Sequence, residues 1–110
     1  MSENDIRHLQ NILLLADKLI QDIGVISYED FIHDELLPDA CAMKLVAIGE
    51  QVNRITDELQ EENPQIPWGA IYGLRNRFAH DYFTIDSKML WDILRNDIGA
   101  LREQIAKILE

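Results

Sequence analysis

Two arginines, an asparagine, a histidine and a tyrosine lie within the eight residues 75–82. An arginine presents a planar fork that fits phosphate oxygens, and a histidine titrates near neutral pH and moves protons. Cleavage of RNA without a metal ion needs these groups: a base for the ribose 2′-hydroxyl, an acid for the leaving oxygen and a cation for the charged phosphorane. The segment is therefore compatible with phosphodiester chemistry, although a cluster of this kind at a helix end is usually a network of caps and ion pairs, here around Asp81.

The spacing of Arg75 and His80 limits how one chain could use them. Five positions along a straight α-helix turn two side chains about 140° apart, so one continuous helix would not aim both at the same phosphate. Either the helix ends between the two residues, or the site is assembled across two subunits. A two-fold dimer would place two copies of the segment face to face and supply two histidines, one as base and one as acid. Arg77 is expected to point to a different side from Arg75, toward solvent or a partner.

The acidity of the chain restricts where nucleic acid could bind. The formal net charge is −10, which repels phosphate backbones at long range and disfavours a broad nucleic-acid surface. Residues 63–80 are a local exception, because they contain no carboxylate and their only formal charges are Arg75 and Arg77. We therefore expect RNA contacts at this segment, and we expect the acidic remainder to suit a basic partner.

The elements around the segment are expected to be helices. Five glycines and three prolines are few for 110 residues, and so favour long helices. Apolar spacing and capping residues predict main helices at about residues 6–23, 39–59 and 67–78, and a last one after the caps at 84–87. A short helix is expected from the Ser27 cap to about residue 35. Short connections between them predict an all-α fold, an antiparallel bundle of four main helices plus a short one, as a single domain over residues 1–110.

The other residues with chemical potential are expected to be structural. The lone Cys41 lies in an apolar run and is predicted to be a buried hydrophobe rather than a disulfide or zinc ligand. His8 and His33 are expected to be exposed, and no residue set suggests a metal site or another cofactor. The acidic N-terminus and the absence of a long apolar stretch predict a cytoplasmic protein without a signal peptide or membrane span.

The segment Arg75-Asn76-Arg77-Phe78-Ala79-His80-Asp81-Tyr82 reads R-N-x-x-x-H-x-Y. It resembles the signature of the HEPN superfamily, specifically the HepT-like toxins. The resemblance covers nearly the whole chain, because four further segments are similar to that family in order and spacing: Tyr28-Glu29-Asp30-Phe31, Ile48-Gly49-Glu50, Ile66-Pro67-Trp68 and Gly73-Leu74. It implies a helical bundle that forms a homodimer, with the active site in the dimer cleft.

The resemblance also implies a function, that of a metal-independent endoribonuclease acting as the toxin of a type VII-like toxin–antitoxin system. Arg75 and His80 would be the catalytic pair, with Asn76 supporting the site. The antitoxin in this family is a minimal nucleotidyltransferase. Its transfer of AMP to Tyr82 (AMPylation) would place phosphate and bulk beside His80 and block RNA from the cleft.

Alternatives remain open for the supporting residues and for the function. Arg77 lies between the two catalytic residues and Asp81 follows them, both as supporting residues, and Glu50 either forms a buried pair with a motif arginine or is a surface carboxylate. Asn76 could cap or brace the turn, and Tyr82 could be an aromatic residue at the core edge with a bonded hydroxyl. The alternative function is a catalytically weak or inactive HEPN binding module that serves as partner or substrate subunit of a nucleotidyltransferase. A structural bundle with no enzymatic role is a third reading.

Overall fold

The computed structural model describes residues 1–110 and contains helices but no strands, which confirms the predicted all-α fold. The α-helices are α1 (Glu3–Ile23), α2 (Tyr28–His33), α3 (Leu37–Arg54), α4 (Asp57–Glu62), α5 (Trp68–His80), α6 (Ser87–Asp92) and α7 (Ile98–Ile108). A 3₁₀ turn (Tyr82–Thr84) follows α5, and a π-helical turn (Ile93–Asp97) joins α6 to α7. None of these helices is both long and apolar enough to cross a membrane.

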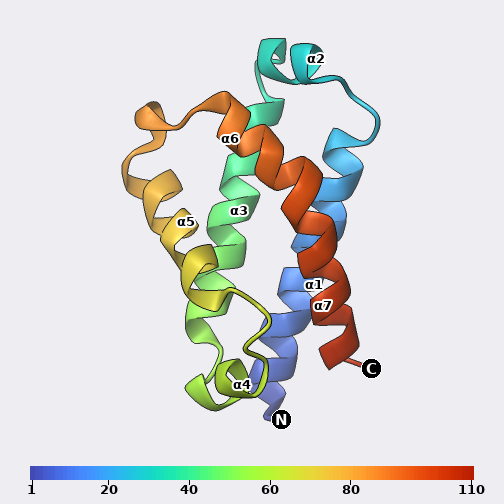
Figure 1. Ribbon diagram of the computed structural model, residues 1–110, viewed down its shortest axis with the longest axis vertical. Helices are drawn as coiled ribbons and strands as arrows, with labels where there is room; N and C mark the ends of the chain where they lie inside the picture. The colour runs from blue at the N-terminus through green and yellow to red at the C-terminus, as the bar shows by residue number, and fades with distance from the viewer.

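The long helices run alternately up and down, as an antiparallel bundle requires (Figure 1). Helix α3 packs against both α1 and α5, and α7 packs along α1. The short helices α2 and α4 lie at opposite ends of the bundle, where the chain turns back (Figure 1). This arrangement places α5, which carries the predicted functional segment, at one side of the bundle, packed against α3.

One hydrophobic core of 23 residues holds the helices together. Its α1 row is Leu9, Ile12, Ala16, Leu19 and Ile23, which recur at three- and four-residue spacing on the face toward α3 and α7. Ile20, next to Leu19 in the chain, lies outside this row and is 40% exposed. Cys41 is fully buried, as predicted, and burial together with the charge of Asp22 raises the pKa of its thiol to about 11.

The predicted single helix over residues 39–59 is wrong, because the chain breaks between α3 and α4. Asp5, only 3% exposed, accepts hydrogen bonds from the Thr56 backbone N–H at 3.1 Å and from Thr56 Oγ1 at 2.7 Å. The Thr56 hydroxyl in turn accepts from the Leu59 N–H at 3.3 Å and caps α4. A buried carboxylate from α1 thus stabilises a turn where the apolar pattern alone predicts a continuous helix.

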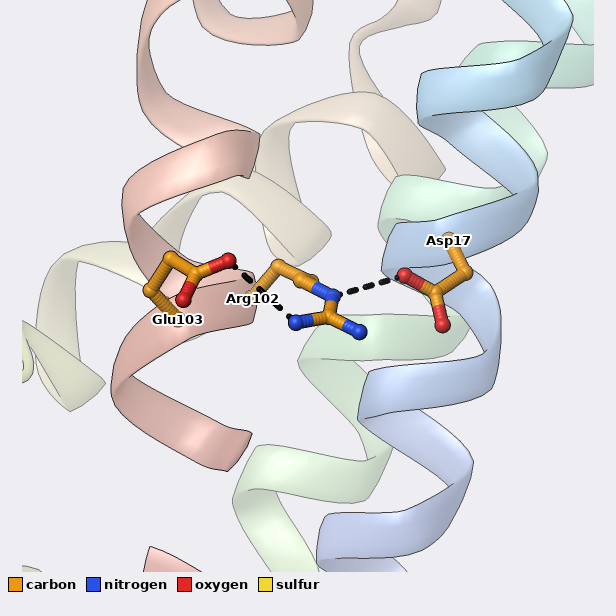
Figure 2. A network of polar contacts seen from close by, with 3 residues as sticks. All are labelled: Asp17, Arg102 and Glu103. Atoms are coloured by element: carbon orange, nitrogen blue, oxygen red, sulfur yellow. Dashed lines mark hydrogen bonds and ion pairs between the residues drawn. The ribbon is translucent and has the colours of Figure 1, made fainter. Parts of the chain in front are cut away.

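The predicted last helix is present, but it contains the π-helical turn between α6 and α7. Arg102 ties this helix to α1: its Nε donates to Asp17 at 2.9 Å, and its Nη1 donates to the neighbouring Glu103 at 3.2 Å (Figure 2). The hydrogen bond and charge of Asp17 raise the pKa of Arg102. All three side chains are partly exposed, so the network fixes the register of the two helices more than it stabilises the fold.

Candidate functional site

Arg75 lies in the middle of α5 and is held in place from two sides. Its Nη2 is 3.4 Å from Glu50 Oε1 on α3, and its Nη1 donates to Asn76 Oδ1 at 2.9 Å. The guanidinium carbon lies 6.0 Å from the centre of the Tyr72 ring. The predicted pairing of Glu50 with a motif arginine is therefore present, but it is not buried, since the side chains are 46% and 25% exposed.

Gly49 explains how α5 comes close enough to α3 for this pairing. A Cβ atom added at Gly49 would lie 2.2 Å from the Cβ of Arg75 and 2.9 Å from its Cγ, distances that real side chains do not reach. Glycine is therefore required at the point where the two helices touch. The Arg75 Nε is buried there without a hydrogen-bond partner.

The outer side of Arg75 opens into a small polar pocket of about 170 Å³, lined by Glu50, Asn53, Arg54, Tyr72 and Arg75. Arg54 was not among the residues predicted for the site. Its one sequence signal is its position four residues after Glu50 on the same helix, which places both on one face of α3. Two guanidinium groups at one pocket are suited to bind phosphate oxygens.

His80 is exposed on the last turn of α5. The helix continues from Trp68 to His80 without interruption, so the alternative in which it ends between Arg75 and His80 is wrong. Neither a hydrogen bond nor an ion pair joins these two residues. Five positions of a continuous helix turn the two side chains about 140° apart, so one chain presents the arginine and the histidine on different sides of α5.

Arg77 and Asp81 lie outside the Arg75 network. The Arg77 Nη1 is 3.5 Å from the sulfur of Met89, on a different side of α5 from Glu50, as its spacing from Arg75 predicted. Asp81 forms none of the ion pairs in the structure. Its role is in the backbone, since its N–H donates to the Arg77 carbonyl at 2.9 Å and its carbonyl accepts from Thr84 Oγ1 at 2.7 Å. The ion-pair network around Asp81 is absent.

Tyr82 leaves the end of α5 on the 3₁₀ turn, and its hydroxyl donates a hydrogen bond to Asp39 in the first turn of α3. Burial, together with the hydrogen bond and charge of Asp39, raises the pKa of Tyr82 to about 12. Sequence reasoning missed Asp39, because the pair is separated by 43 residues and no local pattern joins them. Phe83, the next residue, is fully exposed.

The remaining histidines take no part in this site. His8 was expected to be exposed but is half-buried, with its Nδ1 2.8 Å from Gln51 Oε1 on α3. His33 is exposed, as predicted, and its Nδ1 lies 2.9 Å from the Glu29 carbonyl. No group of three or more His, Cys, Asp and Glu side chains is arranged to hold a metal ion.

An all-helical bundle that carries R-N-x-x-x-H-x-Y at the end of one helix has the features of a HEPN-type protein. Residues 9–108 match the sequence model of the HepT-like family, described as Ribonuclease HepT-like, and the chain therefore belongs to that family. A protein of Caldanaerobacter subterraneus subsp. tengcongensis named “Putative RNase” is 33% identical over 103 residues, covering 94% of this chain and 92% of that protein. A “Probable ribonuclease HepT” of Thermococcus cleftensis is 31% identical over 101 residues, 92% of each chain. No solved structure matches the chain significantly.

Proposed function

We propose that this chain is an endoribonuclease that cleaves RNA without a metal ion, with Arg75 and His80 as its catalytic pair. The observation that carries the proposal is the positioning of Arg75 and the accessibility of His80. Glu50 and Asn76 hold the guanidinium of Arg75, whereas His80 is exposed and has no hydrogen-bond partner that would occupy its ring nitrogens. Both stand on α5, which contains no carboxylate to repel a phosphate. The names of the relatives as ribonucleases support the same assignment.

In the proposed reaction, His80 takes the proton of a ribose 2′-hydroxyl, whose oxygen attacks the adjacent phosphorus. The Arg75 guanidinium stabilises the charge that develops on the phosphorane oxygens, and Arg54 adds a second cation at the same pocket. The partner subunit's His80 protonates the 5′-oxygen as its bond to phosphorus breaks. Asn76 supports the site by accepting from Arg75.

The separation of Arg75 and His80 within one chain supports a homodimer with the site in its cleft. Exposed apolar side chains of the kind that self-association requires lie at the start of α3, within α3 and just after α5. Leu36 at the N-cap of α3 and Met43 within α3 are 78% and 67% exposed, and Phe83 is fully exposed after the end of α5. We propose that two copies meet at this face, so that each brings its functional segment to a shared cleft.

The proposed biological role is that of the toxin in a type VII-like toxin–antitoxin system. The partner would be a minimal nucleotidyltransferase that transfers AMP from ATP to Tyr82. The Tyr82 hydroxyl lies at the surface and two residues after His80, so the added phosphate and nucleoside would occupy the approach to the cleft. The family and the R-N-x-x-x-H-x-Y segment support this role.

The test is cleavage of a broad RNA panel by the purified, partner-free protein in EDTA, after intact mass shows that Tyr82 is unmodified. We expect the wild type to cleave and His80→Ala to lose at least about a hundredfold in rate, since general acid–base groups contribute on the order of 10²–10⁴. Arg77→Ala is the matched control, since Arg77 lies on the same helix but contacts Met89. Equal rates for wild type and His80→Ala would refute the catalytic assignment.

A second candidate function is favoured by the net charge of −10, which suits docking to a basic protein better than to RNA. In this case the chain is a binding module and serves as partner or substrate subunit of the nucleotidyltransferase. Tight binding to the partner together with no RNA cleavage by unmodified protein would favour it. Growth arrest on expression of the chain alone, relieved by His80→Ala, would exclude it.

A further inference from the structure

We infer that Asp39 is the general base for nucleotidyl transfer to Tyr82, so that this chain supplies part of the chemistry of its own modification. The inference rests on the proposed function, in which Tyr82 accepts AMP, and adds a residue and a role to it. Asp39 is on α3, outside the R-N-x-x-x-H-x-Y segment, and nothing in that segment points to it.

The hydrogen bond between the two side chains already has the geometry that proton transfer needs. A general base must lie within hydrogen-bond distance of the proton that it takes, and the Tyr82 hydroxyl donates directly to Asp39 Oδ1. Tyr82 is half-buried and Asp39 is exposed, so the phenol oxygen is fixed while the pair remains open to a nucleotide. Asp39 also lies in the first turn of α3, where the helix dipole favours a carboxylate.

The weak acidity of the Tyr82 phenol explains why Tyr82 needs a base. Its pKa is raised to about 12, so at neutral pH the hydroxyl carries its proton and the free phenolate is too rare to be the nucleophile. A neutral phenol attacks phosphorus slowly unless its proton leaves as the new bond forms. The carboxylate that accepts the hydrogen bond in the resting state is the group placed to take the proton during the attack.

The step balances without a further reactant beyond the nucleoside triphosphate. The Tyr82 oxygen forms a bond to the α-phosphorus of ATP, and the bond from that phosphorus to the bridging oxygen breaks and releases pyrophosphate. The phenol proton passes to the Asp39 carboxylate and then to solvent. Attachment of AMP removes the donor from the hydrogen bond, so the 3₁₀ turn loses its tie to α3 in the modified protein.

The same contact distinguishes Tyr82 from the other two tyrosines. Tyr28 packs against Trp91, with the Lys88 ammonium 5.2 Å from its ring centre. The Tyr72 ring lies 6.0 Å from the Arg75 guanidinium carbon. Neither hydroxyl donates to a carboxylate, whereas that of Tyr82 does. Asp39 therefore selects the tyrosine that is modified, in addition to activating it.

The first experiment measures the reactivity of Tyr82 in the absence of the partner enzyme. Wild type, Asp39→Asn, Asp39→Glu and the surface control Asp92→Asn are treated with adenosine 5′-phosphorimidazolide, which adenylates nucleophiles with loss of imidazole. Rates at each tyrosine are read by intact mass and peptide mapping. We expect Tyr82 to react faster than Tyr28 and Tyr72, Asp39→Asn to slow Tyr82 at least about tenfold, and Asp39→Glu to restore part of the rate. Asp92→Asn changes charge equally at an exposed ion pair, and we expect the wild-type rate.

Several results would overturn the inference. The first is a rate of Tyr82 adenylation in Asp39→Asn that equals or exceeds that of the wild type. The second is labelling of Tyr82 that is no faster than labelling of Tyr28. The third is failure to label Tyr82 under conditions that label tyrosine amide. The second experiment adds a minimal nucleotidyltransferase and ATP. Unmodified Tyr82 in the wild type would then refute the proposed AMPylation, whereas modification of wild type and Asp39→Asn at equal rates would refute only the role of Asp39.

Discussion

At the scale of single residues, the position of Arg75 depends on contacts that are individually weak. The Glu50 carboxylate is almost half exposed and lies 3.4 Å from the guanidinium, and such pairs typically contribute about 0.2–1 kcal/mol. The Asn76 hydrogen bond, at 2.9 Å, comes from the adjacent residue. The arginine is thus oriented by its neighbours without being neutralised by a buried partner, which leaves its charge available to a phosphate.

Glu50→Gln tests this orientation. The amide keeps the size of the side chain but loses its charge, so we expect RNA cleavage to fall by up to about fivefold, the rate equivalent of about 1 kcal/mol, and unfolding free energy to change by less than that. Glu103→Gln is the matched control, since Glu103 also pairs with an arginine, at 3.2 Å, far from the motif. Cleavage kinetics measure the change in rate for each variant, and urea unfolding measures the change in unfolding free energy. A loss above a hundredfold would contradict positioning and give Glu50 a direct part in catalysis.

The site residues differ in how far the sequence could predict them. The Arg75, Asn76 and His80 set was proposed because the three lie together in the chain, and Glu50 because it recurs in the family pattern. Asp39 and Arg54 were missed. The Asp39–Tyr82 contact joins positions 43 apart, and Arg54 reaches the pocket only through the crossing of α3 and α5. Contacts made by tertiary packing leave no periodic signal in one sequence.

At the scale of the helices, boundaries set by local residues were predicted correctly, whereas a boundary set by a tertiary contact was missed. Ser27 caps α2, as predicted, by accepting from the Asp30 N–H at 3.1 Å, and Gly24, with a positive φ of 41°, follows the predicted end of α1; both are local features of the chain. The end of α3 was missed because Asp5, which stabilises it, is 51 residues from Thr56 in the chain. The apolar spacing continues through Ile55 and Leu59, which are both buried, so periodicity alone gives no sign of the break.

Asp5→Ala should therefore destabilise the whole protein rather than only its N-terminus. It removes two hydrogen bonds to a buried carboxylate and leaves the Thr56 N–H without this partner, so we expect a loss of about 2–4 kcal/mol. Urea unfolding measures the loss, and amide exchange at Thr56 reports it locally. Asp92→Ala, which breaks only an exposed pair with Lys88, should stay within about 0.5 kcal/mol. A similar small effect of Asp5→Ala would show that the α3–α4 break does not depend on this carboxylate.

Gly49→Ala tests the crossing of α3 and α5. Since the new Cβ would lie 2.2 Å from the Arg75 Cβ, the helices must separate, and we expect a loss of about 1–3 kcal/mol in unfolding free energy together with slower RNA cleavage as Arg75 moves. Gly99→Ala is the control, because a Cβ there meets no atom within 4 Å and should stabilise α7 by up to about 1 kcal/mol. Equal stability of the two variants in urea unfolding would contradict the close contact.

At the scale of the whole molecule, the distribution of charge determines where two copies could meet. Twenty carboxylates and a net charge of −10 make most pairs of surfaces repel one another. Helix α5 is the exception, with two arginines and no acid. A dimer formed around α5 brings the Arg75 guanidinium groups of two chains to one cleft. The acidity of the remaining surface then favours RNA binding in that cleft alone.

Mixed dimers test whether the two copies of His80 act together. Wild type and His80→Ala are exchanged at equal amounts, and the formation of mixed dimers is verified with a tag on one of them. If one cleft needs both histidines, as base and acid, only the wild-type dimers cleave, and random pairing leaves about a quarter of the full rate. If each subunit has an independent site, about half remains. We expect the quarter, because the proposed reaction uses one His80 as the base and the partner subunit's His80 as the acid, and a purified mixed dimer with half the wild-type rate would contradict the need for both histidines.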